Sequence, residues 1–315
     1  MCISILSTAH PEYPLILLSN RDEFLNRPTA KAHWWEAPNS HVLGGRDLER
    51  REKGTWLGIT KDGRIAVLTN FREEGQEVAK DKSRGGIVTA YLASQSEDSH
   101  SDEAFARYMI EDVGINDVGG FSLIYGRLQP RKDASPSGLS ILSNRTSSAE
   151  GLVRICGKPG ETHGLSNSHF GDLTWPKVVH GEQLLRQAIN ASITRQDTQD
   201  RFITSLFDVL SVDTLPRKKD SEDWNTYTRQ LRNSILIPPV GGEAVESKSS
   251  DHVAAAKATD TPEPTIVKVG EGMYGTQKQT VVLVRRDGKV VFTERTLGAN
   301  PDEERFEFDV DGRPA

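Results

Sequence analysis

Two short polar groups near the start of the sequence could together carry out nucleophilic chemistry. The first is Cys2, directly after the initiator methionine, and the second is the run Asn20-Arg21-Asp22-Glu23. Removal of Met1 would leave one residue with both a thiol and a free α-amine, whose ordinary pKa is near ~7.7–8.0. Such an amine can act as the base for its own thiol. The sequence therefore predicts removal of Met1 and a nucleophilic Cys2, although a chance cysteine followed by a charged turn explains the same residues.

The elements that must position these groups are two short apolar segments. Residues 3–7 and 15–19 are typical of β-strands, and the proline-rich residues 10–14 between them favour a turn. If the two segments pair as strands, the polar run that follows the second one folds back beside Cys2. We expect this hairpin to bring the thiol and the charged residues together.

Other polar residues follow predicted strands further along the chain. Amide groups can donate to an oxyanion, and charged groups can orient an N-terminal amine. Singly, such residues at strand ends are usually solvated turns. Together they predict a catalytic set that comprises Cys2, Arg21, Asp22, Asn70, Asn167 and Arg295. Predicted ligand contacts are Asn20, Glu23, Arg46 and Trp56, although core or loop packing is a simpler role for the tryptophan.

The composition excludes several classes of function. The chain has 315 residues, of which 36% are hydrophobic and 27% charged, with a net charge of −6. A general nucleic-acid binder needs concentrated Lys and Arg, so no nucleic-acid partner is expected. No apolar run approaches the roughly 18–20 residues of a membrane span, and no secretory signal is visible. Two cysteines suit a reducing compartment, so we expect a cytoplasmic protein without a transmembrane segment.

Neither a metal site nor a nucleotide site is expected. The eight histidines show no ligand spacing, and no CxxC motif occurs. The run Gly44-Gly45-Arg46-Asp47 lacks the lysine of a phosphate-binding loop. Cys156 lies within an apolar run and is expected to be an ordinary buried thiol.

The order of the predicted elements favours an α+β fold. Asp-Gly turns predict two hairpins, with strands 55–60 and 64–69 in one and 280–285 and 289–293 in the other. Residues 27–36, rich in Trp and Pro, are expected to form a loop. Further strands are predicted at 121–125, 139–143, 152–156 and 305–308, and helices at 87–93, 104–110, 178–189, 202–210 and 224–231. Strands followed by helices and then strands indicate packed antiparallel sheets in a single domain, 1–315.

Residues 241–264 contain almost no large apolar side chains and are predicted to be a disordered insertion. Deletion of this segment is expected to leave the melting temperature nearly unchanged. Ordering it would cost roughly 1–2 kcal/mol per residue in backbone entropy alone, which its composition cannot repay. A melting temperature many degrees lower in the deletion variant would contradict the prediction.

The chain resembles the NRDE proteins, also called the transport and Golgi organisation protein 2 family. The resemblance rests on Met1-Cys2-Ile3, Asn20-Arg21-Asp22-Glu23-Phe24, Arg27-Pro28, Gly54-Thr55-Trp56-Leu57-Gly58-Ile59, Leu68-Thr69-Asn70-Phe71, Ser83-Arg84-Gly85, Gly120-Phe121-Ser122-Leu123, Asn144-Arg145, Gly164-Leu165-Ser166-Asn167, Trp175-Pro176-Lys177, Tyr274-Gly275-Thr276 and Phe292-Thr293-Glu294-Arg295. It implies an N-terminal-nucleophile hydrolase-like fold, a four-layer αββα sandwich of antiparallel sheets. It also implies a role in Golgi organisation and secretion, and in the handling of haem or acyl-CoA lipids in cytoplasm and mitochondria.

A more distant resemblance is to choloylglycine hydrolases and penicillin V acylases, whose N-terminal cysteine acts with an Arg, an Asp, two Asn and a late Arg. By position these match the catalytic set given above. Two functions therefore remain. One is a thiol amidase or thioesterase that acts on a lipid-like acyl substrate. The other is a protein with a pocket at Cys2 that carries acyl-CoA or haem as cargo without turnover and needs no resident cofactor. The absence of a Cys-Pro dipeptide at Cys2 and Cys156 disfavours ligation of haem by a thiolate.

Overall fold

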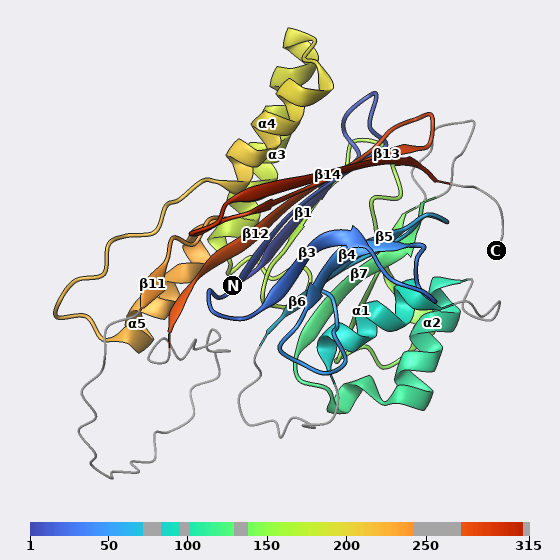
Figure 1. The fold of residues 1–315 in the computed structure, drawn as a ribbon, viewed down its shortest axis with the longest axis horizontal. Helices are drawn as coiled ribbons and strands as arrows, with labels where there is room; N and C mark the ends of the chain where they lie inside the picture. The colour runs from blue at the N-terminus through green and yellow to red at the C-terminus, as the bar shows by residue number, and fades with distance from the viewer. Residues whose placement is uncertain (72–82, 95–100, 129–137, 242–271, 311–315) are drawn as a thin grey trace.

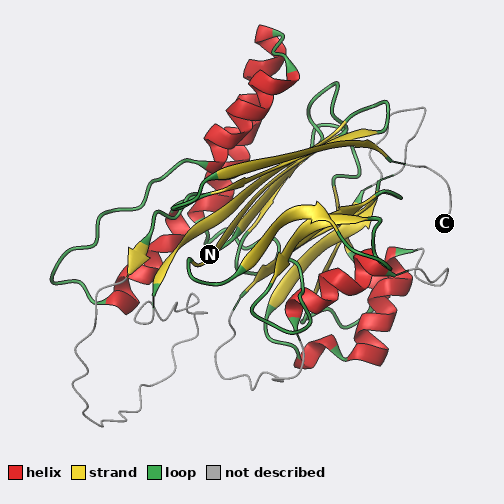
Figure 2. Cartoon of the chain, in the orientation of Figure 1, coloured by secondary structure: helices red, strands yellow, loops and turns green. Residues whose placement is uncertain are grey.

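The computed structural model describes residues 1–71, 83–94, 101–128, 138–241 and 272–310. Within them, two antiparallel seven-stranded sheets lie face to face (Figure 1), and helices cover the outer face of each sheet (Figure 2). The α+β class and the four-layer αββα sandwich expected from the sequence are confirmed. No helix in the described part of the chain is long and apolar enough to cross a membrane.

The first sheet places the start of the chain near its centre. Its strands run in the order β10-β1-β2-β12-β13-β14, and β11 pairs with β12. Their bounds are β1 (Ile3–Ser7), β2 (Leu15–Phe24), β10 (Thr162–Leu165), β11 (Val240–Gly241), β12 (Met273–Val284), β13 (Lys289–Thr296) and β14 (Asp302–Asp309). Because β1 is paired on both sides, with β2 and β10, the residue before it is held in place from two directions.

The second sheet follows chain order and is therefore a simple meander. Its strands are β3 (Thr29–Trp34), β4 (Val42–Asp47), β5 (Leu57–Thr60), β6 (Arg64–Asn70), β7 (Phe121–Arg127), β8 (Leu139–Ser143) and β9 (Val153–Ile155). Gly63 in the turn between β5 and β6 has a φ of 88°, a conformation that glycine adopts without strain. The Asp-Gly hairpin predicted here is confirmed.

Two helical layers bury the outer faces of the sheets. On the second sheet lie α1 (Arg84–Ala93) and α2 (Asp102–Tyr108), and on the first lie α3 (Pro176–Arg195), α4 (Gln199–Leu210) and α5 (Trp224–Thr228). The apolar face of α4 repeats at helical spacing, as the sequence predicted, and it packs against side chains of β2 and β12.

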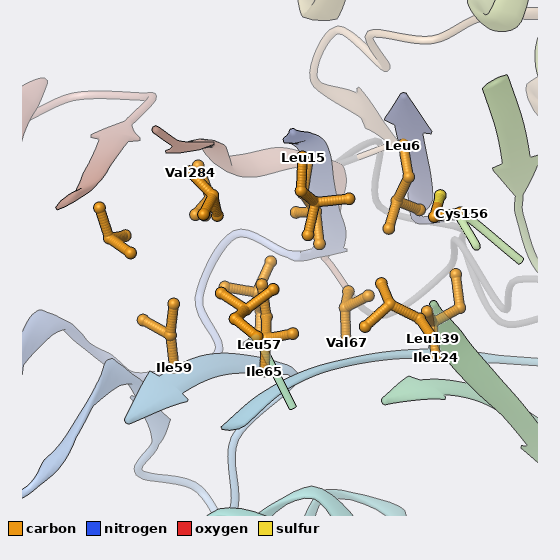
Figure 3. Packing of buried hydrophobic residues seen from close by; sticks show 14 of the residues in the cluster. Leu6, Leu15, Leu57, Ile59, Ile65, Val67, Ile124, Leu139, Cys156 and Val284 are labelled. Carbon is orange, nitrogen blue, oxygen red and sulfur yellow. The ribbon is translucent and has the colours of Figure 1, made fainter. Parts of the chain in front are cut away.

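Between the sheets lies the largest apolar core, in which side chains of both sheets interdigitate (Figure 3). Along β2, Leu15 and Leu17 point into this core, while Ile16 and Leu18 point to the helices on the other side. Both faces of the strand are therefore buried. The same alternation continues to the end of β2 and decides where its polar residues point.

One sequence expectation about the fold is wrong, and another is not tested. Residues 27–36 were expected to form a loop, but residues 29–34 form β3, which pairs with β4 alone and so lies at an edge of its sheet. Its mixed burial hides the alternation that identifies a strand. Of the predicted insertion 241–264, Gly241 belongs to β11 and the rest lies outside the described residues.

Candidate functional site

Cys2 lies directly before β1, at the edge of the space between the sheets. Cys2 and Leu6 are four residues apart and therefore share a face of the strand. Leu6 packs in the core between the sheets, whereas Ile3 and Ile5 point to the helices. The half-buried thiol accepts a hydrogen bond from the backbone N–H of Asp22, at 3.4 Å, and its sulfur lies 3.7 Å from the carbonyl oxygen of the same residue. The predicted hairpin thus does bring the charged run back beside Cys2.

Arg21 crosses the space between the sheets. Its guanidinium carbon lies 4.5 Å from the centre of the Trp56 ring, which belongs to the segment that enters β5. It also donates to the side-chain oxygen of Gln277 and lies 3.9 Å from the carboxylate of Glu23. A cation over an indole face is a favourable contact. Arg21, Trp56 and Glu23, three residues predicted for the site, are therefore in one group.

Two further contacts fix the segment that follows β10. The Asn167 amide donates to the backbone carbonyl of Asn70 at the end of β6. The hydroxyl of the neighbouring Ser166 donates to the carbonyl of Cys2, at 2.6 Å. The chain after β10 therefore touches both Cys2 and the second sheet. The Asn70 side chain itself is exposed.

Asp22 points to the opposite face of the first sheet, toward α3. There its carboxylate lies 3.2 Å from the α-amine of Met1 and 3.8 Å from the side-chain amine of Lys177. The Thr276 hydroxyl donates to the same carboxylate, at 2.7 Å. The Met1 amine also donates to the Tyr274 hydroxyl, and Lys177 donates to the Met1 carbonyl. We call Met1, Asp22, Lys177, Tyr274 and Thr276 the amine cluster.

Burial dominates the electrostatics of the amine cluster. It lowers the pKa of the Met1 α-amine and the pKa of Lys177, although Asp22 opposes both shifts. It raises the pKa of the Cys2 thiol above the ordinary value. Two amines share one carboxylate in a place that water does not reach, so a neutral form of one amine is favoured. With Met1 in place, this raised pKa disfavours the thiolate, which is the nucleophilic form.

Arg295 and Asn20 do not join the group around Cys2, and this corrects the sequence prediction. Arg295 lies 3.8 Å from the centre of the Phe207 ring of α4 and 2.6 Å from the Glu303 carboxylate. The Asn20 amide donates to two carbonyl groups, of Leu210 and Ile235, in the helical layer. Both side chains point to the helical layer because of the strand alternation. They fasten helices to the sheet.

Arg46, predicted as a ligand contact, packs elsewhere. Its guanidinium carbon lies 4.2 Å from the centre of the Trp35 ring, and its Nε donates to the carbonyl of Lys53. Sequence reasoning also missed Lys177, Tyr274 and Thr276. Two of the runs on which the resemblance rests, 175–177 and 274–276, contain all three, but only the tertiary structure places them at Asp22.

The comparison with known proteins decides the family. The Transport and Golgi organisation 2 family matches residues 1–299 of the chain. The chain belongs to this family. The human Transport and Golgi organization protein 2 homolog is 33% identical over 90% of this chain and 87% of its own length. The Drosophila melanogaster Transport and Golgi organization protein 2 is 27% identical over 92% and 88%.

Solved structures with some likeness to this Transport and Golgi organisation 2 family member include an amidase ortholog and an acylase. A Caenorhabditis elegans N-acylethanolamine-hydrolyzing acid amidase ortholog has a TM-score of 0.45 at 13% identity, over 69% of this chain and 88% of that chain. The penicillin V acylase from Agrobacterium tumefaciens has a TM-score of 0.39 at 12% identity, over 98% and 86%.

Alkylation by iodoacetamide is expected to label Cys2 faster than Cys156. Cys2 is half-buried, whereas Cys156 is 1% exposed in the core and burial raises its pKa to about 12. Because the pKa of Cys2 is also raised, its labelling rate should keep increasing above pH ~8.5, the ordinary thiol value. Peptide mass spectrometry over time measures both rates, with Cys2→Ser as the control. Earlier labelling of Cys156 would contradict this order.

Proposed function

We propose that this family member binds a small lipid-like ligand, acyl-CoA or haem, in a pocket beside Cys2 and carries it without turnover. The proposal rests on an intact peptide bond between Met1 and Cys2. While Met1 is present, the nitrogen of Cys2 is an amide without basicity, and the only nearby α-amine lies 3.2 Å from the Asp22 carboxylate. An N-terminal nucleophile needs its own free amine as the base. A chain that retains Met1 therefore lacks this activation of its thiol.

The charges beside the thiol support an anionic ligand. The positive charge of Arg21 favours the thiolate form of Cys2. Its planar guanidinium is held over the Trp56 ring. Guanidinium groups bind carboxylates and phosphates in a forked geometry. Both acyl-CoA and haem carry such groups next to a large apolar part. We further propose that the protein works in the cytoplasm, in association with the Golgi or mitochondria, and that handling of this ligand is its contribution to Golgi organisation and secretion.

Direct titration of the full chain tests the binding. Palmitoyl-CoA and haemin are added to the wild type and to Cys2→Ala, and quenching of tryptophan fluorescence reports the dissociation constant. We expect binding that changes less than about 3-fold in Cys2→Ala, because no covalent bond to sulfur is involved. Arg21→Gln should weaken binding by about 10-fold or more, since a charge-assisted contact is lost. Absence of binding by the wild type would reject the proposal.

An active N-terminal-cysteine amidohydrolase or thioesterase is the second candidate. The observation in its favour is the convergence of Asp22, Tyr274 and Lys177 on the start of the chain, where an N-terminal amine would need to be oriented. It requires removal of Met1, which stays a prediction. In such an enzyme Asn167 is an oxyanion donor, and Asn167→Ala would lower the rate roughly 10²–10³-fold. The matched measurement is hydrolysis of palmitoyl-CoA by protein that lacks Met1.

A further inference from the structure

Met1 fills a buried site on the helical side of the first sheet. It is 2% exposed, and its side chain belongs to an apolar cluster. The other buried members of this cluster come from the start of α3, from the short helix at 229–233, from the segment before β11 and from β12: Trp175, Val178, Leu231, Ile237 and Tyr274. The first residue of the chain therefore lies in a pocket that several separate parts of the fold build around it.

Hydrogen bonds that do not involve Met1 fix the walls of this pocket. The backbone N–H of Ile237 donates to the Thr276 hydroxyl, and the backbone N–H of Thr276 donates to the carbonyl of Ile237, each at 2.8 Å. The Tyr274 hydroxyl donates to the backbone carbonyl of Asp22, at 3.0 Å. Because these contacts remain when Met1 is removed, we expect the pocket to keep its shape. Cavities with apolar walls bind small molecules that match them.

The polar end of the pocket holds the backbone of Met1. The Lys177 amine donates to the carbonyl oxygen of Met1, and the Met1 amine lies 3.2 Å from the Asp22 carboxylate. The side chains of Lys177 and Asp22 are both 0% exposed. From its carbonyl carbon to its terminal methyl group, a methionine residue is an unbranched chain as long as a hexanoyl group. Met1 therefore shows which shape of ligand this pocket accepts.

The balance of charge decides which head group fits once Met1 has left. The amine cluster holds two amines, of Met1 and Lys177, and one carboxylate, of Asp22. When Met1 is removed, the nitrogen of Cys2 becomes an amine in its turn, so two amines still share one carboxylate. A third amine would add to the excess of positive charge, whereas a second carboxylate would balance it. Buried charges are tolerated when they are paired.

We propose that, in chains that have lost Met1, this pocket binds a short unbranched carboxylic acid about as long as hexanoic acid. The carboxylate takes the place of the Met1 carbonyl and accepts from Lys177, and the tail takes the place of the methionine side chain. The Cys2 side chain shares a face of the first sheet with Leu6, which packs between the sheets, so this pocket is a second site. The inference does not rest on the proposed function, which concerns the chain with Met1 in place.

The test compares full chains that begin at Cys2, prepared by cleavage of an N-terminal leader, with chains that begin at Met1. Hexanoate, acetate and hexanamide are titrated into each by calorimetry, and intact mass confirms the first residue. We expect hexanoate to bind the chain that begins at Cys2 at least about 10-fold more tightly, because Met1 fills the pocket in the other. Acetate lacks the tail and hexanamide lacks the charge, so each should bind that chain about 10-fold or more weakly than hexanoate does.

Lys177→Met, made in the chain that begins at Cys2, tests the polar end of the pocket. It should weaken hexanoate binding about 10-fold or more, whereas Lys158→Met, which removes an exposed amine, should leave it unchanged. If Lys177→Met does not fold, the comparison of hexanoate with hexanamide in the unsubstituted chain decides the same point. Equal binding of these two probes would overturn the role of Lys177.

The pocket itself is rejected if hexanoate binds both forms of the chain equally or binds neither. If the chain that begins at Cys2 unfolds without ligand, we expect hexanoate, and not acetate, to restore its cooperative melting transition. Failure of hexanoate to restore it would likewise reject the pocket. None of these outcomes changes the binding of palmitoyl-CoA by chains that keep Met1, so the proposed function is tested separately.

Discussion

Asp22→Asn is expected to destabilise the chain that carries Met1 by about 3–5 kcal/mol, the usual cost of breaking a buried ion pair. The Asp22 carboxylate is the one anion of the amine cluster, with the Met1 amine at 3.2 Å and the Lys177 amine at 3.8 Å. Asparagine has nearly the same shape, so the change removes charge and little packing. The positive charge that the two buried amines hold would then lack a counter-charge. Urea denaturation of both proteins measures the difference in the free energy of unfolding.

Glu303→Gln is the matched control for this substitution. It breaks the contact between Glu303 and Arg295, whose side chains are 46% and 35% exposed. Exposed ion pairs contribute only about 0–1 kcal/mol. Equal losses of stability in Asp22→Asn and Glu303→Gln would show that the amine cluster does not behave as a buried ionic group.

Lys177→Met should destabilise less than Asp22→Asn, by about 1–3 kcal/mol, because it removes one hydrogen bond to the Met1 carbonyl. It leaves one amine and one carboxylate, which is a balanced pair. The double variant should therefore cost less than the sum of the two single ones, as expected for residues in one network. Additive losses would mean that Asp22 and Lys177 act independently.

The pH dependence of Lys177→Met has a definite sign. Burial lowers the pKa of Lys177 in the folded protein, while the unfolded chain has the ordinary value near ~10.4. Between these two values the unfolded chain binds the additional proton, so this group makes the wild type more stable as pH rises toward the unfolded value. The stability difference between wild type and Lys177→Met should grow as the pH rises toward the unfolded value, by at most about 1.36 kcal/mol per pH unit. A difference that shrinks with rising pH would contradict a lowered pKa of Lys177 in the folded protein.

Much of the fold could be predicted because local signals agree with the tertiary structure. The Asp-Gly turns gave both hairpins, and helical spacing gave α4. The edge strand β3 was missed because its burial does not alternate cleanly. Short-range sequence patterns thus predicted elements whose burial is regular.

The site was predicted only in part, because the type of a residue does not show to which face of a sheet its side chain points. β2 is buried on both faces, so its apolar run shows no alternation that separates one face from the other. Arg21 therefore could not be distinguished from Asn20 as the residue that faces the second sheet. Arg295 was misplaced for the same reason on β13. Lys177 and Tyr274 lie 155 and 252 residues from Asp22 (177 − 22 and 274 − 22), and only packing brings them to it.

Carriage without turnover at Cys2 is tested most directly by the intact mass of the protein from its native host, before and after incubation with palmitoyl-CoA. The first spectrum states whether Met1 is present. We predict that protein with Met1 binds palmitoyl-CoA and shows no added palmitoyl mass, and that this binding persists in Cys2→Ala. A palmitoyl adduct that forms with release of coenzyme A, is absent from Cys2→Ala and decays by hydrolysis to palmitate would contradict the carrier function and establish a thioesterase.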